Sequence, residues 1–302
     1  MVGLTKRDEI FFSLYTAGCE VRISETLRCH TSIRIGGDVE YFVVPFTAES
    51  LVAAVEILED AGLKWRVLGA GTNILASDEE TCAVISTKHL TGIWFTEKGV
   101  IAEAGVIVDR LIELAILKGL SGLEFASGLP GTLGGAVTMN AGAFGGEMAG
   151  LVQSAECLMP DMRTVKLDRN EMQFGYRTSA FRRAGAVILR VSLKMTKNDI
   201  SSIKARRREI LNCRILKQPL QLPSAGSVFI RPMADFYVGS KIEGLGFKGY
   251  RVGDAEVSTK HAGFIVNKGN ASQRDVLILI EKLRKAVYED TGHWLQTELD
   301  IW

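Results

Sequence analysis

The stretch of the chain best suited to chemistry runs from Glu124 to Gly146 and reads EFASGLPGTLGGAVTMNAGAFGG. It holds seven glycines and no Lys, Arg or His. Glycine is entropically costly in ordered structure, so this density indicates special backbone angles or close approach to a ligand. Consecutive N–H groups in such turns bind anions without a cationic side chain, and Ser127, Thr132 and Asn140 add neutral donors. Two glycine turns packed against a neighbouring strand explain this stretch equally well.

A second glycine turn, GAGTNI at Gly69–Ile74, follows the strand-like segment WRVL. It begins like the dinucleotide fingerprint G-x-G-x-x-G, but Ile74 stands where the third glycine belongs. The sequence contains no G-x-x-x-x-G-K-[ST] phosphate loop. On its own, this turn leaves nucleotide binding and a plain tight turn both open.

The elements that must position these turns alternate between strands and helices. Hydrophobic patterns predict strands at Val39–Pro45, WRVL, AVIS, VIAEAG, Val152–Met159 and Ala186–Met195. Helical spacing predicts helices at Glu49–Gly62, Ile107–Leu120, Asp199–Leu211 and Ser272–Gly292. Asp and Ser residues stand at N-cap positions of the last two. The recurring strand–helix–strand order predicts an α+β or α/β class for about the first 200 residues.

The composition excludes several classes of protein. A chain of 302 residues is long enough for two or three domains, and its net charge of +1 predicts no affinity for nucleic acid or anionic membranes. The basic run KARRRE at Lys204–Glu209 is interpreted as a solvated helix face. The N-terminus lacks a signal peptide pattern, and no apolar run approaches the length of a membrane span. We therefore expect a cytoplasmic protein.

The cysteines and histidines show no metal-binding spacing. The five cysteines are an odd number without a CxxC pair, which favours buried, reduced thiols at Cys19, Cys29, Cys82, Cys157 and Cys213. The four histidines are His30, His89, His261 and His293. We predict no metal site, and a structural hydrogen bond for His261.

Seven motifs, in order and across nearly the whole chain, resemble those of the UDP-N-acetylenolpyruvoylglucosamine reductases, the flavoenzymes of peptidoglycan synthesis. They are HTSIRIGGDVEYFVVP, VLGAGTNILASD, GLEFASGLPGTLGGAVTMNAGAFGGE, FGYRTSAFR, RILKQPLQLPSAGSVF, VSTKHAGFIVNKGNAS and LQTELDIW. No single motif is decisive, but their order in a chain of the right length is specific. The short connection between Ala155 and Phe174 resembles the shorter, second type of this family.

The resemblance implies an α+β fold with a two-subdomain FAD-binding part of the vanillyl-alcohol-oxidase (PCMH) type and a C-terminal α+β substrate-binding domain. The implied boundaries are 1–88, with an N-terminal helix, then 89–198 and 199–302. It also implies non-covalent FAD, reduced by NADPH, and a monomer. The implied FAD-binding residues are Gly69, Ala70, Gly71, Thr72, Asn73, Ile74, Leu75, Ser127, Gly128, Pro130, Gly131, Gly134, Gly135, Asn140, Ala141, Gly142 and Arg214.

The reaction implied by the resemblance reduces UDP-N-acetylglucosamine enolpyruvate to UDP-N-acetylmuramate. Hydride addition to the enol ether leaves negative charge beside a carboxylate, which needs a cationic or hydrogen-bonding clamp and a proton donor. By their motif positions, Arg177 and Glu298 stabilise this enolate and Ser227 protonates it. Lys217 and Arg231 are the implied substrate-binding residues. Because these residues fall in two predicted domains, the reaction is expected in a cleft between them.

Three departures from the family pattern surround the predicted substrate domain. Ile230 replaces the usual lysine of SVFK, the segment Met233–Gly249 differs from its usual form, and GDA at Gly253–Ala255 replaces GGA. These changes affect the details of substrate binding rather than the flavin. Two other functions stay open: another FAD-dependent oxidase or dehydrogenase on the same scaffold, and a non-catalytic flavin-binding protein.

Overall fold

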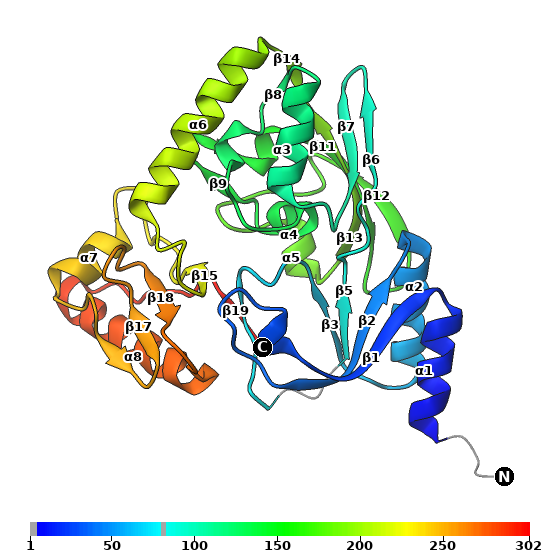
Figure 1. The fold of residues 1–302 in the computed structure, drawn as a ribbon, viewed down its shortest axis with the longest axis horizontal. Helices are drawn as coiled ribbons and strands as arrows, with labels where there is room; N and C mark the ends of the chain where they lie inside the picture. Colours follow the sequence, from blue (N-terminus) through cyan, green and yellow to red (C-terminus); the bar gives the residue numbers. More distant parts are fainter. Residues whose placement is uncertain (1–4, 80–82) are drawn as a thin grey trace. The chain divides into compact units, whose positions relative to one another are not determined.

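The computed structural model describes residues 5–79 and 83–302. Figure 1 shows the fold, which divides into two compact units that each combine distant parts of the sequence. Unit 1 consists of Met1–Glu25, Glu40–Ala70 and Cys82–Asn212, and unit 2 consists of Thr26–Val39, Gly71–Thr81 and Cys213–Trp302. The domain boundaries expected at residues 88 and 198 stay a prediction.

The first layer of unit 1 is a four-stranded sheet in which β5 pairs in parallel with β2 and with β3. Its order is β1 (Cys19–Thr26), β2 (Asp38–Pro45), β5 (Ala83–Ser86) and β3 (Trp65–Leu68). Helix α2 (Ala48–Asp60) contacts β5 and helix α1 (Lys6–Thr16). The apolar stripe of α2 is buried, as its spacing requires, at Leu51, Ala54, Val55 and Leu58.

The second sheet of unit 1 has five strands, and every neighbouring pair is antiparallel. Its order is β12 (Thr164–Asp168), β11 (Val152–Leu158), β13 (Val187–Lys194), β7 (Gly99–Glu103) and β6 (Ile93–Thr96). The short helix α4 (Leu133–Thr138) contacts β7 and β13, and α3 (Val108–Leu117) precedes it in the chain (Figure 1). The predicted helix Ile107–Leu120 ends earlier, at Leu117, because Gly119 has φ +63° and Leu120 enters β8 (Leu120–Ser121).

Unit 2 is built on an antiparallel sheet against which the long helix α8 (Gln273–Thr291) packs (Figure 1). The sheet order is β15 (Ser224–Ser227), β18 (Phe264–Asn267), β17 (Ala255–Val257) and β16 (Arg251–Val252), and α7 (Val238–Gly244) also contacts α8. The core of this unit includes Ile33, Ile35 and Leu75 from the first quarter of the chain. A parallel pair, β4 (Ile74–Leu75) with β19 (Asp300–Ile301), ties the C-terminus to the first glycine turn.

Most elements lie where the sequence predicted them, and the fold is α+β. Helix α8 begins after Ser272, whose hydroxyl accepts the N–H of Asp275, and ends at Gly292 with φ +72°. Helix α6 (Ile200–Lys217) continues beyond the predicted end at Leu211, so it begins in unit 1 and ends in unit 2. The remaining short elements are η1 (Leu27–Cys29), η2 (Glu124–Ala126), β9 (Gly142–Ala143), β10 (Gly146–Glu147), η3 (Met148–Gly150), α5 (Ala180–Ala184) and β14 (Thr196–Lys197).

The cysteine prediction is wrong at one position. All four cysteines in the described residues are free thiols, and burial raises the pKa of Cys19 and of Cys157 to about 11. Cys213 is half-buried, but Cys29 is exposed. Cys82 lies outside the described residues.

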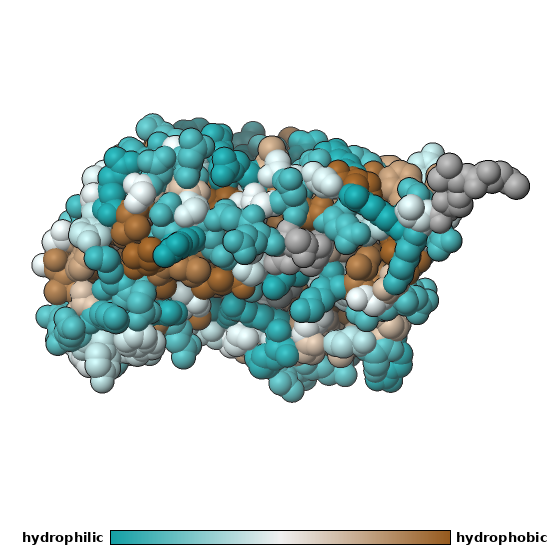
Figure 2. All heavy atoms as spheres, turned by 90° about the horizontal axis from the view of Figure 1, so that it is seen from below, coloured by the Kyte–Doolittle hydropathy of each residue, from teal (hydrophilic) through white to brown (hydrophobic). Residues whose placement is uncertain are grey.

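The surface is predominantly hydrophilic on the face drawn in Figure 2, with separate hydrophobic patches between the polar side chains. Among residues 5–79 and 83–302, none of the helices has the length and apolarity to cross a bilayer.

Candidate active site

The first glycine turn leaves a row of backbone donors unused by secondary structure. It connects β3 to β4, and within the described residues the N–H groups of Gly69–Asn73 donate to no backbone carbonyl. Gly71 has φ +64°, and a Cβ on it would lie 2.0 Å from the carbonyl oxygen of His30. Only glycine fits there without moving the backbone. The turn therefore has the donor set that an anionic or polyhydroxylated ligand requires.

Both flanks of this turn are held by hydrogen bonds or close packing. The carbonyl of Gly71 accepts from the N–H of Ser32 at 2.9 Å and from its hydroxyl at 3.2 Å. A Cβ on Gly69 would lie 2.4 Å from Oγ1 of Thr132, which belongs to the second glycine-rich stretch. Within unit 1, the start of the first glycine turn at Gly69 thus packs against Thr132 in the second glycine-rich stretch. No local pattern predicts this contact, because 63 residues separate Gly69 from Thr132 in the chain.

The second glycine-rich stretch uses part of its glycine for packing. Gly134 lies against β7, where an added Cβ would be 2.8 Å from the Cβ of Ala104, and its N–H donates to the Ala104 carbonyl at 2.8 Å. A Cβ on Gly146 would likewise meet the ring of Phe125 at 2.6 Å. Thr132 caps α4 by accepting the N–H of Gly135. The alternative of close packing therefore accounts for Gly134 and Gly146 without any ligand.

Gly128, in the same stretch, is anchored by an acid that lies outside the motifs recognised in the sequence. Its N–H donates to Oδ1 of Asp109 at 3.0 Å, and Oδ2 of Asp109 accepts from Nη2 of Arg207 at 2.7 Å. Arg207 also donates to Glu113 at 3.3 Å. The interpretation of KARRRE as a solvated face is therefore wrong for Arg207, whose side chain is only 20% exposed. The sequence feature that could have pointed to Asp109 is its place as an acid in the first turn of the predicted helix Ile107–Leu120.

We expect Asp109→Ala to lower the free energy of unfolding by about 2 kcal/mol, because charge-assisted hydrogen bonds to Gly128 and Arg207 are lost together. Chemical unfolding of the variant and the unsubstituted protein measures the difference. Glu113→Ala is the matched control, since it removes only longer contacts, to Arg207 at 3.3 Å and to Arg110 at 3.5 Å. Equal losses in the two variants would contradict the anchoring role of Asp109.

Arg177 lies in a tight turn of unit 1. Gly175 and Thr178 form an isolated antiparallel bridge, with Gly175 N–H donating to the Thr178 carbonyl at 3.0 Å. Arg177 itself has φ +57°, and its carbonyl accepts from Nη1 of Arg182 at 3.1 Å. Its guanidinium carbon lies 5.2 Å from the centre of the Tyr176 ring. An arginine held in a left-handed conformation is strained, and such strain concentrates at functional sites.

Ser227 and Glu298 belong to adjacent segments of unit 2. The N–H of Glu298 donates to the carbonyl of Val228 at 2.8 Å, and Phe229 and Thr297 form a bridge. The side chain of Asn73, in the first glycine turn, donates to the Glu298 carbonyl at 3.0 Å. Ser227 is exposed at the end of β15, and Glu298 is half-buried. Hydrogen bonds within unit 2 thus connect three motifs that are far apart in the sequence, those of Asn73, Ser227 and Glu298.

The predicted cationic residues take different positions. Arg214 is buried, at 5% exposure, in the last turns of α6, whereas Lys217 is exposed at the end of that helix. Both lie on α6 because the helix extends beyond Leu211. Arg231 is exposed, with its guanidinium 4.8 Å from the centre of the Tyr237 ring. The structural hydrogen bond predicted for His261 is confirmed, since its Nδ1 accepts the N–H of Gly263. Burial lowers the pKa of the His261 imidazole.

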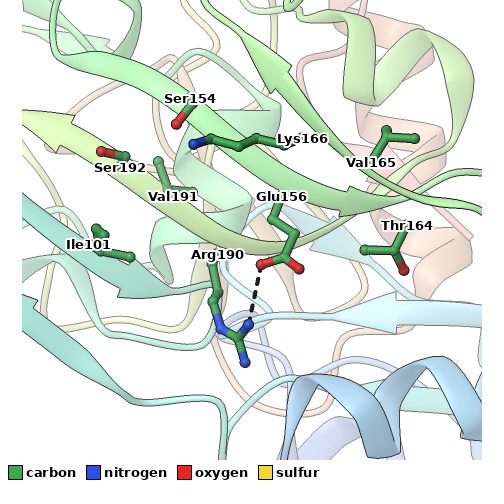
Figure 3. A pocket seen from close by; sticks show the side chains of 9 residues that line it. All are labelled: Ile101, Ser154, Glu156, Thr164, Val165, Lys166, Arg190, Val191 and Ser192. Carbon is green, nitrogen blue, oxygen red and sulfur yellow. Dashed lines mark hydrogen bonds and ion pairs between the residues drawn. The ribbon is translucent and has the colours of Figure 1, made fainter.

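A cavity of about 520 Å³ opens on the five-stranded sheet of unit 1, and none of its lining residues belongs to these motifs (Figure 3). Its walls are Ile101, Ser154, Glu156, Thr164, Val165, Lys166, Arg190, Val191 and Ser192. Arg190 reaches Glu156 at 3.2 Å, Glu49 at 3.3 Å and Glu103 at 3.7 Å. Its charge is compensated by these carboxylates, so it is not poised for an anionic ligand, and the cavity contains none of the predicted site residues.

Comparison with known proteins links both parts of the chain to described families. Residues 39–168 match the model of an FAD binding domain, and residues 218–302 match the C-terminal domain of UDP-N-acetylenolpyruvoylglucosamine reductase. A UDP-N-acetylenolpyruvoylglucosamine reductase of Thermotoga sp. (strain RQ2) is 48% identical over 98% of this chain and 98% of its own. The corresponding protein of Thermotoga maritima is 48% identical over 92% of this chain and 97% of its own.

A solved structure extends the similarity to three dimensions. The crystal structure of UDP-N-acetylenolpyruvylglucosamine reductase from Thermus caldophilus aligns with a TM-score of 0.79 and 34% sequence identity. The alignment covers 94% of this chain and 98% of that one. The similarity therefore includes both sets of segments that form the two units.

Proposed function

Since the chain belongs to the family of UDP-N-acetylenolpyruvoylglucosamine reductases, we propose how its own residues divide the work of that reaction. The protein is an FAD-dependent UDP-N-acetylmuramate dehydrogenase of peptidoglycan precursor synthesis, which uses NADPH to reduce UDP-N-acetylglucosamine enolpyruvate. The observation that carries the assignment of roles is the junction in unit 2 of Ser227–Val228, Glu298 and Asn73.

The first glycine turn fits the pyrophosphate and ribityl groups of FAD. Within residues 5–79 and 83–302, the N–H groups of Gly69–Asn73 are directed to no backbone acceptor, and Gly71 holds a left-handed backbone in which a Cβ would clash with the carbonyl of His30. We propose that this turn, with Ile74 and Leu75, holds the cofactor together with Arg214 and with Ser127, Pro130, Gly131, Gly135, Ala141 and Gly142. FAD held there would supply the hydride chemistry that the methylene carbon of the enolpyruvyl group requires, with NADPH as the reductant of the flavin.

Arg177 and Glu298 are proposed to stabilise the charge that develops on the substrate. Hydride addition at the methylene carbon leaves negative charge on the neighbouring carbon and its carboxylate. A guanidinium presents a fixed fork of donors that matches a carboxylate-like enolate. Glu298 helps to polarise or protonate the intermediate. The N–H of Glu298 donates to the Val228 carbonyl, and its carbonyl accepts from the Asn73 side chain. These two bonds support the role, because they fix the backbone that carries the Glu298 carboxylate.

Ser227 is proposed to donate the proton that completes the reduction. The carbon next to the carboxylate takes this proton, so the product gains one hydride and one proton. A serine hydroxyl is a weak acid, but the enolate carbon is a strong base, which makes the transfer favourable. The exposure of Ser227 at the end of β15 leaves its hydroxyl accessible to a substrate.

Substrate binding is proposed to involve Lys217 and Arg231, whose charges suit a diphosphate. Both side chains are exposed, and Arg231 is oriented by the ring of Tyr237. Ile230, which replaces a lysine of the family pattern, donates its N–H to the carbonyl of Gln296 at 2.9 Å. This bond uses the backbone alone, so the loss of the lysine affects substrate affinity rather than the fold.

We also propose a monomer in the cytoplasm, with no membrane or nucleic-acid partner. A net charge of +1 supports the absence of nucleic-acid binding. Sedimentation equilibrium of the purified protein tests the oligomeric state. A dimer at micromolar concentration would contradict the proposed monomer.

The test of the function is a visible absorbance trace under anaerobic conditions. We expect a yellow protein that loses its colour with NADPH and regains it when UDP-N-acetylglucosamine enolpyruvate is added. Bleaching without recovery would contradict the assigned substrate while keeping the flavin. A colourless protein that takes up no added FAD would contradict the assigned cofactor. Rapid turnover of an alcohol or amine with release of peroxide would indicate an oxidase instead.

A further inference from the structure

Asn140 is a buried amide at the end of the second glycine-rich stretch, and its side chain is fully used within unit 1. It is 2% exposed and has φ +44°. Its Nδ2 donates to the carbonyl of Gly175 at 3.0 Å and to Oε2 of Glu147 at 3.2 Å, and its Oδ1 accepts the N–H of Ala149 at 2.9 Å. Its own N–H donates to the carbonyl of Val137 at 3.0 Å. The side chain therefore has no remaining donor for a cofactor.

The bond to Gly175 connects Asn140 to the base of the turn that carries Arg177. Gly175 and Thr178 pair with each other, so residues 175–178 form a closed four-residue turn with Tyr176 and Arg177 at its tip. The next residue, Ser179, is completely buried, and its hydroxyl donates to the carbonyl of Thr138 at 2.7 Å. Both sides of the turn are thus bound to the end of α4, through Asn140 on one side and Thr138 on the other.

The two attachments fix the backbone of the turn at Arg177. A non-glycine residue with φ +57° is held there only if the surroundings determine the backbone. A shift of about 1 Å in a catalytic group lowers a rate by about 100-fold. The amide of Asn140 tolerates the left-handed conformation that its own position requires, which alanine adopts less readily.

We propose that Asn140 is a positioning residue for Arg177 and not a ligand of FAD, with the buried hydrogen bond from Nδ2 to the Gly175 carbonyl as the connection. The inference rests on the proposed role of Arg177 in stabilising the enolate. It assigns Asn140 to the reduction of substrate and leaves the binding of FAD to other residues of the stretch.

The experiment compares the two half-reactions in Asn140→Ala. We expect the FAD affinity and the rate of flavin reduction by NADPH to stay within about 3-fold of the unsubstituted protein, whereas reoxidation by substrate slows by about 10- to 100-fold. Asn140→Gly keeps the positive φ without strain and should show the same loss. Asn170→Ala, at an exposed turn, is the matched control and should leave both half-reactions unchanged. Glu147→Gln keeps an acceptor oxygen for Asn140 and should change little.

Two further measurements separate positioning from a general loss of structure. In an Arg177→Ala background, the additional change Asn140→Ala should alter substrate reoxidation by less than about 3-fold, because the group that it positions is already absent. Ser179→Ala removes the other attachment and should reproduce the selective loss, even if the Asn140 variants fold poorly.

Different outcomes identify which claim fails. Loss of FAD affinity in Asn140→Gly with normal reoxidation of the bound fraction would overturn the positioning role in favour of a cofactor contact. Normal reoxidation with normal FAD affinity would overturn it as well. Failure of the unsubstituted protein to be reoxidised by substrate would instead overturn the proposed function, and no variant is needed to see that.

Discussion

Ser227→Ala is expected to leave the reduction of the flavin by NADPH intact and to slow the reduction of substrate by about 10²- to 10⁴-fold. The range is that of general acid catalysis, which this variant removes. In the proposed mechanism only the second half-reaction consumes the proton of Ser227, so the rates of the two half-reactions should separate. Anaerobic stopped-flow absorbance measures each half-reaction in turn. Ser227→Cys, which keeps a proton donor, should recover part of the lost rate.

A neighbouring serine provides the control for this result. Ser224 begins the same strand, and its structural contact is made through its carbonyl, which accepts the hydroxyl of Ser32 at 2.6 Å. Ser224→Ala should therefore retain both half-reactions. Unchanged turnover in Ser227→Ala would remove Ser227 from its role. A parallel loss in both variants would indicate damage to the strand rather than to a proton donor.

Gly71→Ala is expected to yield a colourless protein whose affinity for FAD is at least about 100-fold lower. The added Cβ would lie 2.0 Å from the carbonyl oxygen of His30 and 2.9 Å from Cα of Thr31, so the turn must move. Alanine also pays about 1–2 kcal/mol to adopt the left-handed conformation. Because we propose that the turn offers its N–H groups to the cofactor, displacement of this backbone should misdirect them. The ratio of visible to ultraviolet absorbance and a flavin titration measure the loss.

Gly62→Ala separates the two effects expected in Gly71→Ala, which are the steric clash of the added Cβ and the left-handed backbone conformation. Gly62 has φ +70°, close to the +64° of Gly71, but a Cβ there would have no heavy atom within 4 Å. It should therefore show the conformational cost alone, as a small decrease in the melting temperature with normal FAD content. Full FAD occupancy in Gly71→Ala would contradict the assignment of this turn to the cofactor.

The sequence by itself determined the elements and the family. Periodic apolar residues gave α2 and α8, and Ser272 and Gly292 set the ends of α8, because helix formation and capping depend on residues within a few positions of one another. The glycine turns and the catalytic motifs were recognisable in order for the same reason, since each is a short contiguous stretch. The end of α6 was predicted too early, at Leu211, although the first proline after it, Pro219, stands two residues beyond the observed end at Lys217.

Only the tertiary structure decided which segments belong together. Residues 26–39 and 71–81 join the C-terminal part, where Ile33, Ile35 and Leu75 complete its core. The partners of Arg207 and Asn140 were equally hidden, since their bonds reach Asp109 and Gly175 across 98 and 35 residues. Contacts of this kind depend on how the whole chain packs, and no local pattern of residue types encodes them.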